Sequence, residues 1–306
     1  MRQYKGHSTF PQHYIDIVIE EFLNTKRGNG KVVPIAKGWS YMVYSIDDSL
    51  IVRIPKFTNY NEKIKIEVDL LRALKGLLPI TIPEPEIRRV KKNGIDTMFM
   101  IYSQIPGIIP DPCYMNNINY FKIGAYLSSF LNVLHTIPLS IVDNIKLNRV
   151  GAINLKNRYK MIFIKLKKYG FPLLNNATVV YLQNLFDKFL SLDLSDFTPV
   201  LIHGDIGPGN ILFNQNCLHI TGIIDWEDCE VGDPAIDLAG VRSYLGNKIF
   251  NIVYEKYTGK IDSTFMERIR FYESVIGIYP LLYGIENNHE VYIKKGINQL
   301  INQHPK

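Results

Sequence analysis

The chain has 306 residues, of which 46% are hydrophobic and 21% are charged, as in ordinary globular proteins. This composition excludes disorder over most of the length, and the length favours two lobes over one small core. The formal net charge is +6, but the lysines and arginines are scattered, so we expect no nucleic-acid partner and associate the positive charge with an anionic small molecule.

The first part of the chain has the pattern of a β-sheet with helices. Residues 12–24 carry apolar positions at helical spacing, and a second helix is predicted at 61–76, where Gly76 ends it. Short β-branched and aromatic runs separated by turn residues predict antiparallel hairpins. These strands are predicted at 31–36, 41–46, 49–56, 86–91 and 97–102, the last two around the turn Asn93-Gly94.

After the Pro- and Gly-rich segment QIPGIIPDP, helical patterns predominate. We therefore place a boundary near residue 105, with an N-terminal lobe of 1–105 and a C-terminal lobe of 106–306. Helices are predicted at 117–135, 155–169, 177–191, 248–257, 262–285 and 288–303. The exception is 199–225, where PVLIHGD, NILFN and ITGIIDW have the pattern of short strands.

Polar residues stand at the ends of these short strands. Asp205 and Asp225 each end an apolar run, and Asn210 lies between them. In phosphoryl transfer one carboxylate orients the attacking hydroxyl and takes its proton, while a second carboxylate and an amide hold the metal. Carboxylate and amide oxygens are hard ligands that suit Mg²⁺. We therefore predict Asp205 as the base and Asn210 and Asp225 as metal ligands.

Each aspartate taken singly has another interpretation, because aspartates commonly cap helices and form turns. The combination of both aspartates with four further residues favours an active site over a set of turns; these are His203, Asn210, Asp233 and Asp237.

The residues of this segment resemble the motifs of a known family. His203-Gly204-Asp205 followed by Asn210 resembles the catalytic loop of eukaryotic-type protein kinases, and Ile224-Asp225-Trp226 stands where that superfamily has Asp-Phe-Gly. Gly204 in place of the usual arginine, together with GDPAID at 232–237, resembles the aminoglycoside phosphotransferase family of antibiotic and small-molecule kinases. The segment LLYGIENNHEVYIKKGINQL is similar to the C-terminal helices of its 2″ branch.

The resemblance covers nearly the whole chain and implies an α+β, bilobal protein-kinase-like fold. An N-terminal antiparallel β-sheet lobe with a helix would bind the nucleotide, and a larger, mainly helical C-terminal lobe would bind the acceptor. His203 and Asp237 are expected to give structural support to the catalytic loop.

The resemblance also implies donor-binding residues in the first lobe. Arg53 stands at the position of the phosphate-binding cation, where the family usually has lysine, and Glu67 is the matching helix acid. An exposed ion pair of no functional importance is the alternative for these two residues. Further donor contacts are expected from Gly38 and Ser40 in the turn over the phosphates and from Ser103 and Ile105 beside the purine.

The sequence signals for acceptor-binding residues are less specific than those for donor-binding residues. Tyr279 and Tyr283 lie four residues apart and could form a pocket wall, although core packing is the usual role of such a pair. Glu273 and Glu286 are further acids of unknown orientation. We predict acceptor-binding roles for Glu227, Asp228, Glu230, Tyr279 and Tyr283.

The cellular location is predicted from the lack of signal-peptide and membrane-span patterns in this sequence. The N-terminal segment MRQYKGHSTFPQHY has no apolar core of signal-peptide length, and no stretch reaches the roughly 18 apolar residues of a membrane span. We expect a cytoplasmic monomer with no membrane partner. Cys113, Cys217 and Cys229 give no metal-ligand pattern, and we interpret all three as packing residues.

The predicted function is Mg²⁺-dependent transfer of the γ-phosphate of ATP or GTP to a hydroxyl of an antibiotic, giving resistance. A 2″-type aminoglycoside kinase comes first because of the C-terminal resemblance. A macrolide or another small molecule stays open, because the 2″ branch has an acid where this chain has Tyr279. A nucleotide-binding pseudokinase or interaction module is the alternative of another class, and the presence of the base Asp205 disfavours it.

Overall fold

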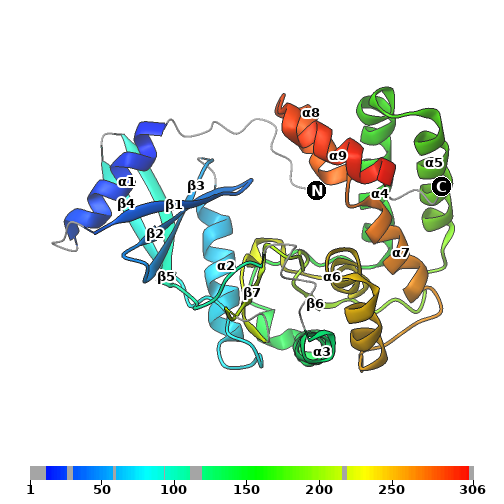
Figure 1. The fold of residues 1–306 in the computed structure, drawn as a ribbon, viewed down its shortest axis with the longest axis horizontal. Coiled ribbons are helices and arrows are strands. Elements are labelled where there is room, and N and C mark those ends of the chain that lie inside the picture. The colour runs from blue at the N-terminus through cyan, green and yellow to red at the C-terminus, as the bar shows by residue number, and fades with distance from the viewer. Residues whose placement is uncertain are drawn as a thin grey trace.

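The computed structural model describes residues 12–25, 30–57, 60–92, 94–110, 119–215 and 219–302, arranged in two lobes (Figure 1). Cys113, Cys217 and Asn93 lie outside the described residues. Cys229 is buried, which agrees with the packing role predicted for it. Within the described ranges, no helix combines the length and the apolar character needed to cross a membrane.

The N-terminal lobe contains a five-stranded antiparallel sheet in the order β1-β2-β3-β5-β4, as predicted. Arg53 on β3 lies opposite Val43 of β2 and Met100 of β5, and is therefore at the centre of the sheet. The strands are β1 (Val32–Lys37), β2 (Tyr41–Ile46), β3 (Leu50–Pro55), β4 (Glu86–Lys92) and β5 (Ile95–Ser103).

Both faces of this sheet are covered by helices, because neighbouring strand residues point to opposite faces. Phe99 packs under α1 (Gln12–Thr25), and the next residue, Met100, packs under α2 (Asn61–Leu74). Figure 1 shows α2 between the sheet and the C-terminal lobe. The buried positions of α2 include Glu67, which therefore faces the sheet together with the apolar side chains.

The C-terminal lobe is mainly helical and contains the largest apolar core of the part that the structure describes. Among its helices, α3 and α6 pack side by side, and α6 also packs against α7. The helices are α3 (Tyr120–Thr136), α4 (Ala152–Lys165), α5 (Asn176–Ser191), α6 (Ala235–Glu255), α7 (Phe265–Val275), α8 (Ile278–Glu286) and α9 (Glu290–Asn302).

Two helices differ from the prediction. The helix predicted at 262–285 is two helices, α7 and α8, separated by a turn at Ile276 and Gly277. Gly277 packs closely on α9, since a Cβ there would lie 2.9 Å from Gln299 Cβ. The helix predicted at 248–257 starts earlier, at Ala235. Gly246 interrupts it with φ 81° and ψ 170°, which breaks the apolar periodicity and conceals the first half from a pattern search.

Short strands bring the polar segments of this lobe together. β6 (Val200–Ile202) pairs with β9 (Glu230–Gly232), and β7 (Ile211–Phe213) pairs with β8 (Ile220–Ile223), both antiparallel. β9 was not predicted, because three residues are too few to show an alternating pattern. The two pairings place the loop after β6 beside the segment that follows β8.

Candidate active site

A cleft of about 1070 Å³ lies between the lobes, and most of the predicted site residues line it. Glu67, Ser103, His203 and Asp237 do not reach its surface. Ser103 is exposed at the end of β5, whereas the other three are buried. The predicted residues that line the cleft are Gly38, Ser40, Arg53, Ile105, Asp205, Asn210, Asp225, Glu227, Asp228, Glu230, Tyr279 and Tyr283.

Asp205 and Asn210 are joined within one tight loop after β6. The Nδ2 atom of Asn210 donates to the backbone oxygen of Asp205 at 2.8 Å and to its Oδ2 at 2.9 Å. Gly204, at φ 83°, precedes them, and a Cβ there would collide with the carbonyl oxygen of Asp228. Only glycine therefore fits this position, which accounts for its presence where protein kinases have arginine.

Asp225 follows β8 and has the left-handed backbone conformation, with φ 64° and ψ 67°. This conformation is uncommon for a residue other than glycine and is often found at functional sites. Its side chain is 43% exposed and faces the cleft. The backbone N–H of Ile224 donates to the carbonyl of Asn210 at 2.9 Å, so Asp225 is held next to the Asp205 loop.

Arg53 joins two carboxylates from different parts of the chain. Its Nη1 atom donates to Glu67 Oε1 at 2.5 Å and its Nη2 atom to Asp225 Oδ1 at 2.8 Å. Arg53 and Glu67 are only 5% and 3% exposed, so the alternative of a surface ion pair is wrong. Burial alone would lower the pKa of Arg53, but Glu67 and Asp225 outweigh it and raise that pKa well above its ordinary value.

Asp237, at the start of α6, supports the loop that precedes Asp205. Its Oδ2 and Oδ1 atoms accept hydrogen bonds from the backbone N–H groups of His203, at 2.9 Å, and Gly204, at 2.8 Å. His135 Nε2 lies 3.1 Å from Oδ2. Burial would raise the pKa of Asp237, but the contacts with His135 and His203 together outweigh it and lower that pKa, so the carboxylate stays charged.

His203 connects the loop to the segment before Asp225. Its Nε2 atom lies 3.1 Å from the carbonyl oxygen of Ile224, and its Nδ1 atom accepts from the backbone N–H of Asp205 at 3.3 Å. This arrangement requires the proton on Nε2. Burial lowers the pKa of His203 despite the nearby Asp237, so the ring is kept neutral.

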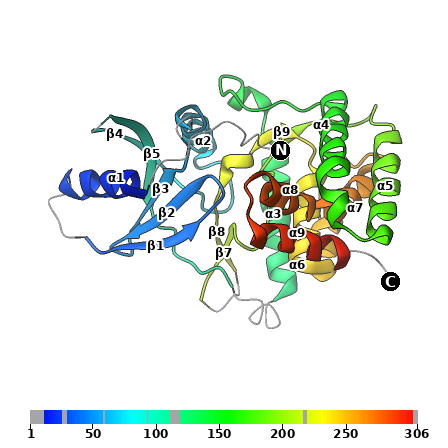
Figure 2. The ribbon, with the colours of Figure 1, turned by 90° about the horizontal axis from the view of Figure 1, so that it is seen from above.

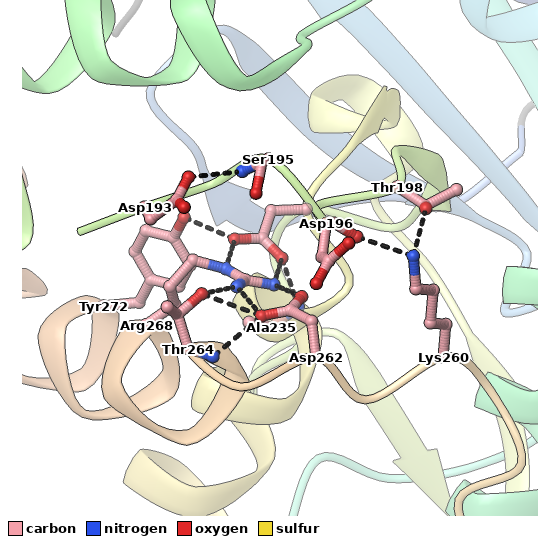
Figure 3. A network of polar contacts seen from close by, with 11 residues as sticks. Asp193, Ser195, Asp196, Thr198, Ala235, Lys260, Asp262, Thr264, Arg268 and Tyr272 are labelled. Atoms are coloured by element: carbon pink, nitrogen blue, oxygen red, sulfur yellow. Dashed lines mark hydrogen bonds and ion pairs between the residues drawn. The ribbon is translucent and has the colours of Figure 1, made fainter.

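A second buried network fixes the start of α6 (Figure 3). Arg268 of α7 is fully buried and binds Asp233 at 2.7 Å and Asp262 at 2.7 Å. Tyr272 also donates to Asp233, at 2.6 Å. Asp233 in turn accepts from the backbone N–H of Ala235 at 3.0 Å, so the network holds the helix that carries Asp237.

Two of the acids considered for acceptor binding are already paired with cations. Glu230 is buried and accepts two hydrogen bonds from Arg158, at 2.6 and 2.7 Å. Glu286 is paired with Lys165 at 2.9 Å. Glu273 is absent from the cleft lining. The other two acids considered, Glu227 and Asp228, line the cleft.

Comparison with known proteins identifies the family. The model of the phosphotransferase enzyme family (APH) matches residues 31–259, which is most of the chain. The chain belongs to this family. Viomycin phosphotransferase from Streptomyces vinaceus is 22% identical to it over 241 residues, which are 78% of this chain and 82% of that protein.

Solved structures of phosphotransferases share its fold. APH(2″)-IIIa, solved with GDP and kanamycin, superposes with a TM-score of 0.82 at 23% identity, over 96% of this chain and 98% of that one. Macrolide 2′-phosphotransferase type I gives a TM-score of 0.71 at 19% identity, over 96% and 98% of the two chains. At such low identity the likeness concerns the fold, and the predicted bilobal kinase-like α+β class is confirmed.

Local sequence patterns did not mark several residues in and around the cleft of this phosphotransferase. Arg158, which lines the cleft, and Lys165 lie in a predicted helix, but nothing in the sequence marks them as partners of Glu230 and Glu286. Trp39 lies between Gly38 and Ser40 in the turn after β1, and its ring contacts the other lobe. Tyr41 packs its ring 4.4 Å from the Arg53 guanidinium. No local pattern marks such partners, which come from distant segments.

Proposed function

We propose that this phosphotransferase transfers the γ-phosphate of ATP or GTP, with Mg²⁺, to a hydroxyl of a small-molecule antibiotic. The observation that carries the proposal is the convergence of Asp205, Asn210, Asp225 and Arg53 on one cleft. A carboxylate base, two oxygen ligands and a buried cation are the parts that phosphoryl transfer requires. Location in the cytoplasm and a monomeric state stay predictions.

The donor atoms support a role for Mg²⁺. Both hydrogen bonds of the Asn210 side chain use Nδ2, and its Oδ1 atom is the one suited to a cation. With the half-exposed carboxylate of Asp225, this makes a pair of hard oxygen ligands, and phosphate and water oxygens would complete the coordination. Asn210 and Asp225 would hold the ion, which neutralises charge on the phosphates when bound.

Each protein residue then has one task. Arg53 contacts the phosphates through a guanidinium whose position Glu67 maintains. Asp205 orients the acceptor hydroxyl and takes its proton. The acceptor oxygen forms a bond to the γ-phosphorus while the bond from that phosphorus to the bridging oxygen breaks, and the nucleoside diphosphate leaves with the bonding electrons. Placement of the groups contributes more than basicity.

An aminoglycoside is the first acceptor class, because of the C-terminal resemblance and the fold shared with APH(2″)-IIIa. A macrolide is the second, and a specific observation favours it. Glu230 and Glu286 are already compensated by Arg158 and Lys165, which leaves less negative charge for a polycation. The cleft also has aromatic walls suited to an acceptor with more apolar surface.

The test is nucleotide turnover with Mg²⁺ against a panel of hydroxylated antibiotics. Kanamycin, gentamicin, a macrolide and viomycin are each incubated with ATP and, separately, with GTP, and phosphorylated product is detected by mass spectrometry. The Asp205→Ala variant serves as the control that lacks the base. Product formation with the unchanged chain and none with the variant supports the proposal. Absence of product from the whole panel, with a folded protein, refutes an antibiotic in these classes as acceptor.

A further inference from the structure

An aromatic cluster joins the two lobes. Trp39, in the turn between β1 and β2, is stacked on Tyr283 of α8, with ring centroids 4.5 Å apart and planes 13° from parallel. Tyr292 of α9 meets both rings edge-on, at 5.7 Å from Trp39 and 5.0 Å from Tyr283. Figure 2 shows the β1–β2 end of the sheet directed toward α8 and α9. The contact therefore ties one turn of the sheet to the last two helices.

Each side of the aromatic cluster is fixed by contacts within its own lobe. On the turn, the hydroxyl of buried Ser40 lies 3.1 Å from that of Tyr60, and Lys56 Nζ donates to the carbonyl of Gly38. On the other side, a Cβ on Gly284 would lie 2.6 Å from the backbone nitrogen of Ile293. The helix α8 is thus packed closely on α9. A displacement of the turn relative to α8 must open the stack of Trp39 on Tyr283.

The cluster also connects the two halves of the cleft. Trp39 and Tyr283 line the same cleft as Asp205 and Asp225. The turn of Trp39 stands on the side proposed for the donor phosphates. Tyr283 belongs to the helix that also carries Tyr279, on the side proposed for the acceptor. One ring pair therefore links elements assigned to different substrates.

We propose that Trp39 and Tyr283 are positioning residues whose stack holds the turn over the donor phosphates at a position set by α8. This inference rests on the proposed function, since it assumes a nucleotide beneath the turn. A stacked aromatic pair changes an equilibrium constant by about two- to tenfold. Such a contact is strong enough to bias the turn and weak enough for ligands to open. Because coupling is reciprocal, any change in nucleotide affinity that an acceptor causes through α8 is matched by an equal change in acceptor affinity caused by the nucleotide.

The first test uses tryptophan fluorescence and needs no acceptor. The chain contains only two tryptophans, and the second, Trp226, is 1% exposed in the core. Trp39 fluorescence, taken as the difference between the unchanged chain and Trp39→Phe, reports the stack directly. Tyr283→Ala is expected to alter the emission of Trp39 and to weaken binding of Mg·ADP or Mg·GDP by about two- to tenfold. Tyr283→Phe, which keeps the ring, is expected to behave as the unchanged chain does.

The second test measures nucleotide hydrolysis without acceptor. Loss of the stack admits water beside the phosphates, so Tyr283→Ala is expected to raise uncoupled hydrolysis and lower kcat for transfer. Phe121→Ala is the matched control, since Phe121 is a 63% exposed ring on α3 that is absent from the cleft lining. A change in the thermal midpoint alone, with binding and hydrolysis unaltered, would mean that the cluster only stabilises the fold.

The outcomes separate this inference from the proposed function. If no antibiotic is phosphorylated but Tyr283→Ala weakens nucleotide binding, the positioning role stands and the acceptor class fails. If an antibiotic is phosphorylated but folded Tyr283→Ala keeps the nucleotide affinity, the uncoupled hydrolysis rate and kcat, the positioning role is overturned. A chain that binds neither nucleotide overturns both.

Discussion

The guanidinium of Arg53 lies 2.8 Å from the carboxylate of Asp225, which is 172 residues further along the chain. The other arm of the same guanidinium holds Glu67. An arginine can bind two carboxylates at once through its fork of donors, whereas lysine offers one compact ammonium group. The geometry therefore gives a physical reason for arginine where the resembled family usually has lysine.

Replacement of Arg53 tests this arrangement. We expect Arg53→Ala to raise the nucleotide KM or lower kcat, with little change in the acceptor KM, because the lost contacts are to phosphates. It should also lower the free energy of unfolding by about 3–5 kcal/mol, since Glu67 is left buried without its partner cation. Steady-state kinetics and urea unfolding measure the two effects. Equal changes in both KM values would indicate a role in folding alone. Arg53→Lys, which keeps the positive charge, is the comparison variant and is expected to have smaller effects than Arg53→Ala.

Asp225 is expected to be indispensable for transfer. Asp225→Asn keeps the size of the side chain but removes the charge that holds Mg²⁺, so phosphorylation of every acceptor should fall to background while the protein stays folded. Product formation is followed by mass spectrometry and folding by circular dichroism. Full activity in this variant would remove Asp225 from the metal site.

Asp205 is expected to act on the acceptor rather than on the nucleotide. Asp205→Asn should lower kcat by about 10² or more, the range typical of a positioned acid–base group, with nucleotide affinity nearly unchanged. The amide also retains an oxygen able to accept from Asn210, so the loop should keep its shape. Kinetics and nucleotide titration of the same preparation provide the measurement. Retained kcat, or lost nucleotide affinity with kcat intact, would contradict a catalytic role.

His203 should make stability depend on pH in a defined direction. Burial lowers its pKa in the folded state, so below the unfolded value of about 6.5 the unfolded chain binds more protons than the folded one. Stability contributed by neutral His203 is therefore complete above about pH 6.5 and is lost as the pH falls toward the folded pKa. The slope is at most about 1.4 kcal/mol per pH unit, because one proton is involved.

The comparison variant is His203→Gln, which does not titrate and keeps a donor for the Ile224 carbonyl. We expect it to be less stable than the unchanged chain near neutral pH and to lose less stability on acidification. Urea unfolding at several pH values between about 7.5 and about 5.5 measures both slopes. Identical slopes would show that protonation of His203 does not contribute.

Much of the fold could be predicted from local pattern. The strands β1 to β5 and the helix α2 follow from alternating or helical apolar spacing, because that spacing records which face is buried. The cleft-lining residues Asp205 and Asp225 were recognisable because each follows an apolar run, and Asn210 because it lies between them directly before another apolar run. Their catalytic roles remain predictions, which the variants above test.

Other features were decided by packing between distant segments. The division between α7 and α8 lies where Gly277 packs closely on α9, and the apolar period of the sequence does not mark this position. Asp237 belongs to a helix whose start is set by Asp233 and its buried partner Arg268.

The charge on the proposed acceptor side of the cleft could not be predicted from local pattern either. The sequence contains Glu230 as one acid among several near Asp225, and nothing local reveals that Arg158, 72 residues earlier, compensates it. Likewise, Trp39 and Tyr283 have ordinary neighbours in sequence and meet only because a turn of one lobe reaches a helix of the other. Sequence by itself determined which residues could carry the chemistry, because strand ends and loop residues have local patterns. The tertiary structure decided which charges are available and which rings touch, since both depend on distances between elements that no local pattern encodes.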